Sequence, residues 1–218
     1  MSISNYAENK LLDAVFNFTT TGGGLPTANP YVALHTAAPG ETGTSEATGG
    51  SYARQQADFA AAAAGTLQNN ANIDFASMPA VTGNGIVGWS AWDAVSAGNC
   101  LWTGWLSLTS GLAEVRSGDF ATDLVQSVAH GLVADNRVVF EAVEGLTLPN
   151  PLDQTTIYWV ISTGLTTDTF RVSTTQGGAA VNLVTTAGSA IWRLVGNKTV
   201  NSGDTFRIAT GDLDVFLD

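Results

Sequence analysis

Apolar and polar residues alternate with a period of two along residues 85–106, GIVGWSAWDAVSAGNCLWTGWL, which predicts two β-strands joined by a turn. The linker at 94–99 is small and polar, as is typical of a hairpin loop. Four of the six tryptophans lie in this stretch: Trp89, Trp92, Trp102 and Trp105. Because apolar residues occupy both sides of the strands, we expect the hairpin to lie centrally, or between a core and a partner subunit.

A second apolar pattern, with helical spacing, covers Asn5–Phe16. Its apolar stripe consists of Ala7, Leu11, Leu12, Val15 and Phe16. Asn5 can cap the first turn, and Glu8 three residues later completes a pattern similar to a capping box. The pattern predicts one helix that covers a sheet face. A helix that mediates subunit contacts is the alternative.

Short strands bounded by turn residues are predicted over the rest of the chain. Before the hairpin they cover residues 31–36, 52–59 and 72–76, with loops at 18–30 and 78–84 and an alanine run at 60–64 that continues as strand or loop. After the hairpin they cover 123–128, 137–143, 157–162, 169–173, 190–194, 206–210 and 213–217. The sequence therefore predicts an all-β fold with one N-terminal helix.

A change in composition after residue 108 predicts two domains. We expect a sandwich-like β-domain of residues 1–110 plus 197–218, interrupted by a small β-barrel or β-sandwich module at 111–196. Because an insertion between adjacent strands leaves its host domain at a loop end, the module should project outward.

The charge of the chain restricts its partners. The net charge is −11, and the eight Lys and Arg residues are spread singly, so we expect no nucleic-acid binding. Charged residues make up only 12 %, and the many neutral polar positions suit a protein that packs into a larger assembly. No apolar run has the length of a membrane span, and no secretory signal is expected, so synthesis should occur in a cytoplasm.

Candidate catalytic chemistry is sparse. Cys100 is the single cysteine, so neither an intrachain disulfide nor a multi-cysteine zinc site can form. His35 lies within a predicted strand and is expected to be a packed or surface residue, while His130 precedes a glycine at a turn and should make a local hydrogen bond. No G-x-S-x-G motif occurs, and no Lys-Ser/Thr follows the glycines at 85 and 88. We predict no catalytic residues, no cofactor and no enzyme activity.

Two other groups of residues allow a binding role. Asp212, Asp214 and Asp218 have the even spacing that places side chains on one face of a final strand, where three carboxylates can bind calcium. The preferred interpretation is a charged, solvated edge strand that resists edge-to-edge pairing. The four hairpin tryptophans can stack on sugar rings of a host surface, but core packing or burial between subunits is favoured.

Several segments resemble a family of small structural proteins of tailed bacteriophages, described as minor tail or tail-fibre proteins. They are AENKLLD at 7–13, YVALHTAAPG at 31–40, GGSYARQ at 49–55, the hairpin WDAVSAGNCLWTGWL and the closing VNSGDTFRIATGDLDVFLD. AHGLVADNRVVF at 129–140 and TTDTFRVSTTQGGAAVNL at 166–183 are similar to a module often inserted before the closing strands of these proteins. LPNPLDQTTIYWV departs from the usual pattern of that module.

The resemblance implies a non-enzymatic structural protein of a phage virion, made in the bacterial cytoplasm. It would act by self-assembly and by docking to other virion proteins, as a homo-oligomer for which a trimer is one candidate. Two alternatives stay open: a decoration protein on the phage head, and a carbohydrate-binding module that contacts a host-surface glycan.

Overall fold

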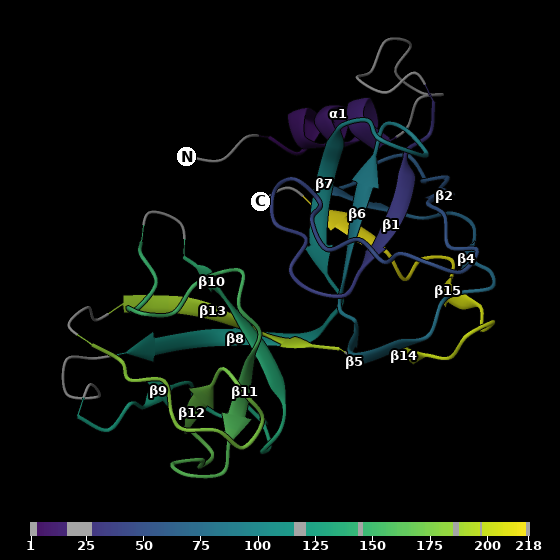
Figure 1. Ribbon diagram of the computed structural model, residues 1–218. Helices are drawn as coiled ribbons and strands as arrows, with labels where there is room; N and C mark the ends of the chain where they lie inside the picture. The colour runs from purple at the N-terminus through teal and green to yellow at the C-terminus, as the bar shows by residue number, and fades with distance from the viewer. Residues whose placement is uncertain are drawn as a thin grey trace. The chain divides into compact units, whose positions relative to one another are not determined.

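The computed structural model describes residues 4–16, 28–115, 121–143, 146–184, 188–196 and 198–216 (Figure 1). Within these residues the chain forms one helix, α1 (Asn5–Phe16), followed by strands β1 to β16. The predicted all-β fold with an N-terminal helix is therefore confirmed. The loop predicted at 18–30 lies mostly outside the described residues.

The chain divides into two compact units. The first contains Met1–Gly104 and Lys198–Asp218, and the second contains Trp105–Asn197. The sequence-based boundary at 110/111 falls within a strand, β8 (Ser107–Val115). That the second unit is an insertion able to fold alone stays a prediction.

The first unit is built on a four-stranded sheet. Its order is β2 (Gln55–Gln56), β1 (Tyr31–His35), β6 (Gly88–Trp92) and β7 (Cys100–Trp105). The β6–β7 neighbours are the predicted hairpin, and β1 pairs antiparallel with β6 from Tyr31↔Trp92 to His35↔Gly88. The strand predicted at 52–59 is reduced to β2, because Tyr52 and Arg54 turn their side chains to other segments, as described below.

Three two-stranded ribbons complete the first unit. They pair β5 (Val81–Ile86) with β14 (Lys198–Val200), β4 (Ile73–Phe75) with β15 (Phe206–Ile208), and β3 (Thr66–Gln68) with β16 (Asp214–Phe216). The last part of the chain thus runs back along the segment before the hairpin. The predictions for β4, β15 and β16 are confirmed within a few residues, but the loop predicted at 78–84 is wrong from residue 81 on, because β14 supplies pairing partners from far along the chain.

Glycines allow tryptophan rings to pack tightly in this unit. A Cβ at Gly104 would lie 2.6 Å from Nε1 of Trp89, which is 4 % exposed. Gly43, with φ +65°, leaves the same kind of space for the ring of Trp92. Glycine in a strand or loop often marks such a close approach. The large side chains that are fully buried in this unit include Leu12, Phe16, Leu34, Leu67, Ile73, Phe75, Met78 and Ile86.

The second unit is a closed six-stranded barrel. Its order is β10 (Arg137–Ala142), β11 (Tyr158–Ile161), β12 (Thr169–Ser173), β9 (Val125–Gln126), β8 and β13 (Gly188–Val195), with β13 pairing back to β10. The structure therefore decides for a barrel over a sandwich. No strand was predicted between the hairpin and residue 123, so β8 was missed; it becomes a strand by pairing with β13 from Gly188↔Val115 onward.

The barrel interior is filled by aromatic and branched side chains. The Phe140 ring stacks with Phe170 at 6.4 Å and meets Tyr158 edge-on at 5.6 Å. Trp192 is 2 % exposed, and its indole Nε1 donates to Ser127 Oγ at 2.8 Å. That bond satisfies the one polar atom of the largest buried side chain.

Candidate docking surface at helix α1 and strand β7

The residue that caps helix α1 is Ser4 rather than the expected Asn5. The backbone N–H of Ala7 donates to Ser4 Oγ at 3.4 Å, and that of Glu8 donates to the Ser4 carbonyl at 3.0 Å. Ser4 therefore occupies the N-cap position, and Asn5 is the first helical residue. The predicted helix is confirmed at both ends, while the predicted cap is wrong by one residue.

Polar side chains of α1 attach the helix to the rest of the first unit. Asn9 Oδ1 accepts the backbone N–H of Gly65, and Asp13 Oδ1 accepts that of Ala62, each at 2.8 Å. On the apolar side, the Phe16 ring meets Phe59 at 5.1 Å and Trp102 of β7 at 5.7 Å, both edge-on. These contacts set the distance between α1 and β7.

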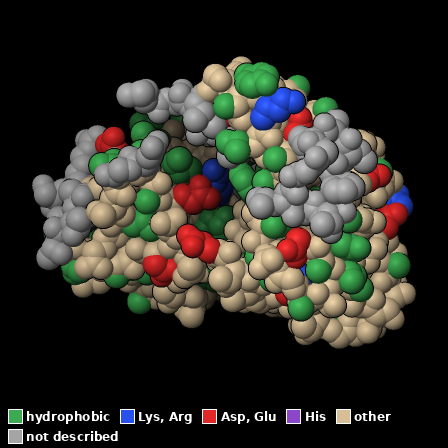
Figure 2. Space-filling view, turned by 90° about the horizontal axis from the view of Figure 1, so that it is seen from above, with side chains coloured by type: hydrophobic (Ala, Val, Ile, Leu, Met, Phe, Trp, Pro, Cys, Tyr) green, Lys and Arg blue, Asp and Glu red, His purple; other side chains and the backbone are tan. Residues whose placement is uncertain are grey.

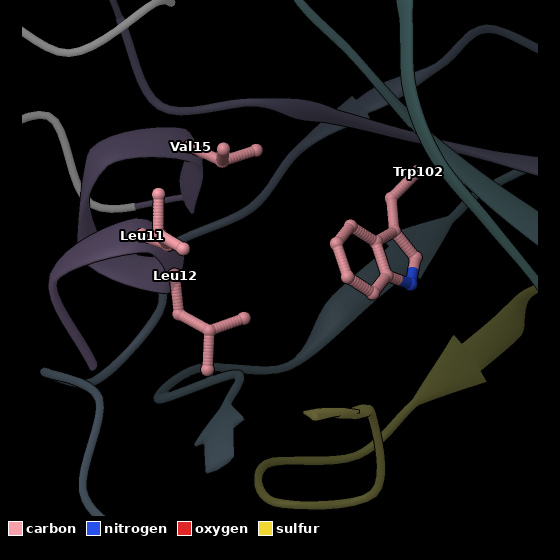
Figure 3. Close-up of a pocket in the computed structure, with 4 residues that line it drawn as sticks. All are labelled: Leu11, Leu12, Val15 and Trp102. Carbon is pink, nitrogen blue, oxygen red and sulfur yellow. The ribbon is translucent and has the colours of Figure 1, made fainter. Parts of the chain in front are cut away.

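An apolar hollow of about 230 Å³ lies between α1 and β7. Figure 3 shows Leu11, Leu12 and Val15 on the helix, facing the indole ring of Trp102 on the other side. Leu12 is buried, whereas Leu11 is 53 % exposed at the rim. The predicted apolar stripe thus divides into a buried part and a part that leaves apolar surface open to solvent.

Strand β7 is at the end of its sheet. Among the described residues its strand neighbour is β6 alone, so its other backbone edge offers N–H and C=O groups to a further strand. The sequence CLWTGW contains no charge and no proline, the features with which exposed edges usually resist pairing. An open apolar hollow beside an uncharged edge strand is the geometry of a protein-docking surface.

The hairpin tip next to this surface is held by Arg54. Its guanidinium lies 3.5 Å from the centre of the Trp92 ring and makes hydrogen bonds of 2.8–3.2 Å to both carboxylate oxygens of Glu46. The same guanidinium donates to the Ala94 carbonyl at 3.1 Å and to the Ala97 carbonyl at 2.8 Å. Sequence analysis missed this residue, whose one signal is a lone Arg among small residues.

His35 is a buried residue with both ring nitrogens bonded, which confirms the packed alternative. Nδ1 lies 2.7 Å from the Thr44 carbonyl, and Nε2 lies 2.7 Å from Ser90 Oγ. Trp92 Nε1 donates to the same Ser90 oxygen at 2.6 Å. Burial lowers the pKa of His35 below its ordinary value.

His130 makes the local hydrogen bonds that its sequence context predicts. Its Nδ1 accepts the backbone N–H of Leu132 at 2.9 Å, and its Nε2 lies 3.3 Å from the Thr169 carbonyl. The ring also packs edge-on against Phe170. This histidine therefore connects its own loop to strand β12.

Of the three aspartates at the end of the chain, the structure describes Asp212 and Asp214. Asp214 accepts a hydrogen bond from Gln68 Nε2 at 2.6 Å across the β3–β16 ribbon, and Asp212 lies in the preceding turn. Asp218 lies outside the described residues. Within those residues, no group of three or more His, Cys, Asp or Glu side chains could hold a metal ion.

The hairpin tryptophans differ in exposure. Trp89 and Trp92 are 4 % and 8 % exposed, which confirms core packing for these two and leaves no open ring face for a sugar. Trp102 and Trp105 are half-buried. Trp102 faces the apolar hollow, whose lining offers no hydrogen-bond partner for sugar hydroxyls except its own indole N–H.

Basic side chains are spread over the molecular surface, as the sequence predicts. Figure 2 shows the Lys and Arg side chains lying apart from one another on the face that it draws, each beside an Asp or Glu side chain. None of the helices in the described part of the chain is long and apolar enough to span a membrane.

A family model described as "Podophage GP4 fiber I protein gp80" matches residues 2–128, more than half of the chain. The chain belongs to this family. Searches of curated proteins and of solved structures found no match.

Membership in this fibre family confirms the expected kind of protein, a phage structural protein of tail-fibre type. The matched residues contain α1, the hollow, the hairpin and strand β7. The match ends between β9 and β10, so it does not bear on the predicted relation of the rest of the barrel to an inserted module.

Proposed function

We propose that the protein is a non-enzymatic component of a phage tail fibre and that it acts by docking through the surface formed by α1 and β7. The hollow lined by Leu11, Leu12, Val15 and Trp102 carries the proposal. Exposed apolar surface beside a free strand edge costs solubility, and proteins retain such a surface where a partner covers it.

A second copy of this chain is the partner that we propose. Leu11 projects at the rim while the hollow lies beside it, so one surface offers both a protruding side chain and a space for one. β7 and the lining of the hollow carry no charged side chain, and the two carboxylates of α1, Glu8 and Asp13, are buried, so two copies with a net charge of −11 can meet there without placing exposed carboxylates in contact. In a closed homo-oligomer, such as a trimer, the docking surface of every copy would be covered by a neighbouring copy.

The oligomeric state and one substitution test this proposal. We expect the purified protein to be oligomeric at micromolar concentration by light scattering after size exclusion, and Leu11→Glu to shift it to monomers with unchanged circular dichroism. Tyr6→Glu is the matched control, because Tyr6 is also exposed on α1 but lies well around the helix from Leu11. A wild-type monomer at high micromolar concentration would contradict self-docking.

Copy number per virion separates the tail from the head. A fibre component predicts a handful of copies in multiples of three or six, as measured by quantitative mass spectrometry against the major capsid protein. A ratio near one, or a simple fraction of one, would instead assign the docking surface to the capsid lattice. A host receptor role would require a glycan that quenches tryptophan fluorescence, and we expect none to do so through Trp89 or Trp92, which are buried.

We also propose that the barrel is an insertion that folds separately from the first unit. The chain leaves the first unit after Gly104 and returns to it at Lys198, and the barrel has its own buried core. Replacing residues 106–196 with a short Gly-Ser linker should leave a folded first unit with a cooperative thermal transition. Loss of that transition would reject the insertion.

A further inference from the structure

We propose that residues 36–54 form a strap that His35 locks onto the β1–β6 part of the sheet, and that protonation of His35 releases it. The strap begins directly after His35 and ends at Arg54, which holds the hairpin tip. Release would therefore free both the strap and the tip at residues 93–99. This inference is independent of the proposed docking surface.

The lock is a continuous chain of buried hydrogen bonds. His35 is 0 % exposed, and its Nδ1 must carry the proton because it faces a carbonyl oxygen, that of Thr44 in the strap. Nε2 is then an acceptor for the Ser90 hydroxyl. The Ser90 oxygen in turn accepts the Trp92 indole N–H, so every hydrogen bond in the series joins one donor to one acceptor. The chain is complete only while His35 is neutral.

The strap has few apolar contacts before its end, where the Tyr52 ring stacks on Phe75 at 6.0 Å and the Tyr52 hydroxyl accepts the Leu34 N–H at 2.9 Å. Its buried residues are small: Pro39, Gly43 and Ala47. Its backbone meets the sheet through the Ala47 N–H, which donates to the Leu34 carbonyl at 2.8 Å. Because residues 36–51 bury so little apolar surface, this part of the strap opens at a lower free energy than the neighbouring sheet.

The charges around His35 come from the strap itself. Glu46 pairs across from His35 in an isolated bridge, but its carboxylate is engaged by Arg54 at 2.8 Å and accepts the Tyr52 hydroxyl at 3.2 Å. The Arg54 cation opposes a second positive charge nearby. On the β6 side the neighbours are neutral, Ser90 and Trp92. A proton on Nε2 would find no free carboxylate. It would also remove the acceptor to which the Ser90 hydroxyl donates in this series of hydrogen bonds.

The direction of the pH effect follows from burial. In the locked state burial lowers the pKa of His35, whereas in the released state the ring is solvated and its pKa is ordinary, about 6.5. Below about pH 6.5 the released state therefore binds more protons. Stability of the lock is complete above that pH and falls as the pH is lowered toward the depressed pKa.

Hydrogen exchange of the wild-type protein between pH 7.5 and 5.0 tests the lock, because carboxylates stay ionised in that range. After correction for intrinsic exchange, the opening constant of the strap amides Thr36, Thr44 and Ala47 should rise by up to tenfold for each pH unit below about 6.5. The barrel amides Val160 and Val181, and the β4–β15 ladder, should show no such slope.

Two variants separate the histidines, since the chain has only two. His35→Asn keeps a side-chain N–H for the Thr44 carbonyl but cannot titrate, so strap opening should be higher at neutral pH and independent of pH. His130→Gln, in the barrel, should retain the wild-type slope in the strap. A strap opening constant independent of pH in the wild type would overturn the proposal even if His35→Asn failed to fold. An equal slope in the β4–β15 ladder would do the same, because the first unit would then open as a whole.

Discussion

The substitution Gly111→Ala tests the closest contact in the barrel. Gly111 lies on β8 opposite Trp192 on β13, and the indole ring crosses the space that a side chain at 111 would need. A Cβ at this position would lie 2.8 Å from both Cζ2 and Nε1 of Trp192 and 2.9 Å from Cε2. Contact begins to be ordinary at 3.4 Å, so the ring must move by roughly half an ångström.

The ring cannot move freely. Trp192 is 2 % exposed, and its Nε1 is held by Ser127 at 2.8 Å. Overpacking a core costs about 1–3 kcal/mol, and loss of the indole hydrogen bond would add about 1 kcal/mol. Alanine recovers about 0.4–1 kcal/mol by restricting the unfolded chain. We therefore expect Gly111→Ala to lower the free energy of unfolding of the barrel by about 1–3 kcal/mol.

A double-mutant cycle with Trp192→Phe isolates the contact. Phenylalanine lacks the indole nitrogen and the ring atoms nearest to position 111, so the double variant should be more stable than the sum of the single effects by about 0.5–3 kcal/mol. Urea unfolding followed by circular dichroism measures all four proteins. If the two effects add within about 0.3–0.5 kcal/mol, Gly111 is not there to make room for the ring, and the reasoning is refuted.

Two further predictions concern charged groups. Arg54→Lys keeps the charge but loses the planar guanidinium that bonds Glu46 and two carbonyls. It should destabilise the first unit by about 1–3 kcal/mol in denaturant unfolding, and hydrogen exchange should be faster in the hairpin tip at 93–99. An unchanged unfolding midpoint would show that the guanidinium is not needed. Burial acts to raise the pKa of Asp153, but hydrogen bonds from Thr156 and Thr155 prevail and lower it to about 2. The wild-type barrel should therefore lose stability as the pH falls from the ordinary carboxyl range toward about 2. Asp153→Asn should lack that part of the acid dependence, and equal acid profiles for the two proteins would contradict the assignment.

Local pattern was sufficient for those elements whose own residues specify them. The helix at Asn5–Phe16 and the β6–β7 hairpin were predicted because apolar spacing and turn residues lie within each element. β5, β3 and β14 were missed because each is short or polar and becomes a strand only by pairing with residues more than a hundred positions away. For the same reason the sequence could identify the hairpin tryptophans but not the hollow, which needs α1 and Trp102 brought together.

Strand β8 was missed for a more specific reason, which concerns what a glycine indicates in a sequence. Ser110-Gly111 has the composition of a turn and no strand was predicted there, yet Gly111 lies in the middle of a nine-residue strand. Glycine signals a turn when the backbone needs a positive φ, as at Gly98 in the hairpin tip, where φ is +76°. It signals a close approach when a neighbouring ring needs the space of a Cβ, as at Gly104 and Gly111. Each of these two strand glycines lies against a buried tryptophan ring, Trp89 or Trp192. In a chain with 24 glycines and six tryptophans, a glycine within an alternating apolar segment is therefore better interpreted as the space for a distant ring than as the end of a strand.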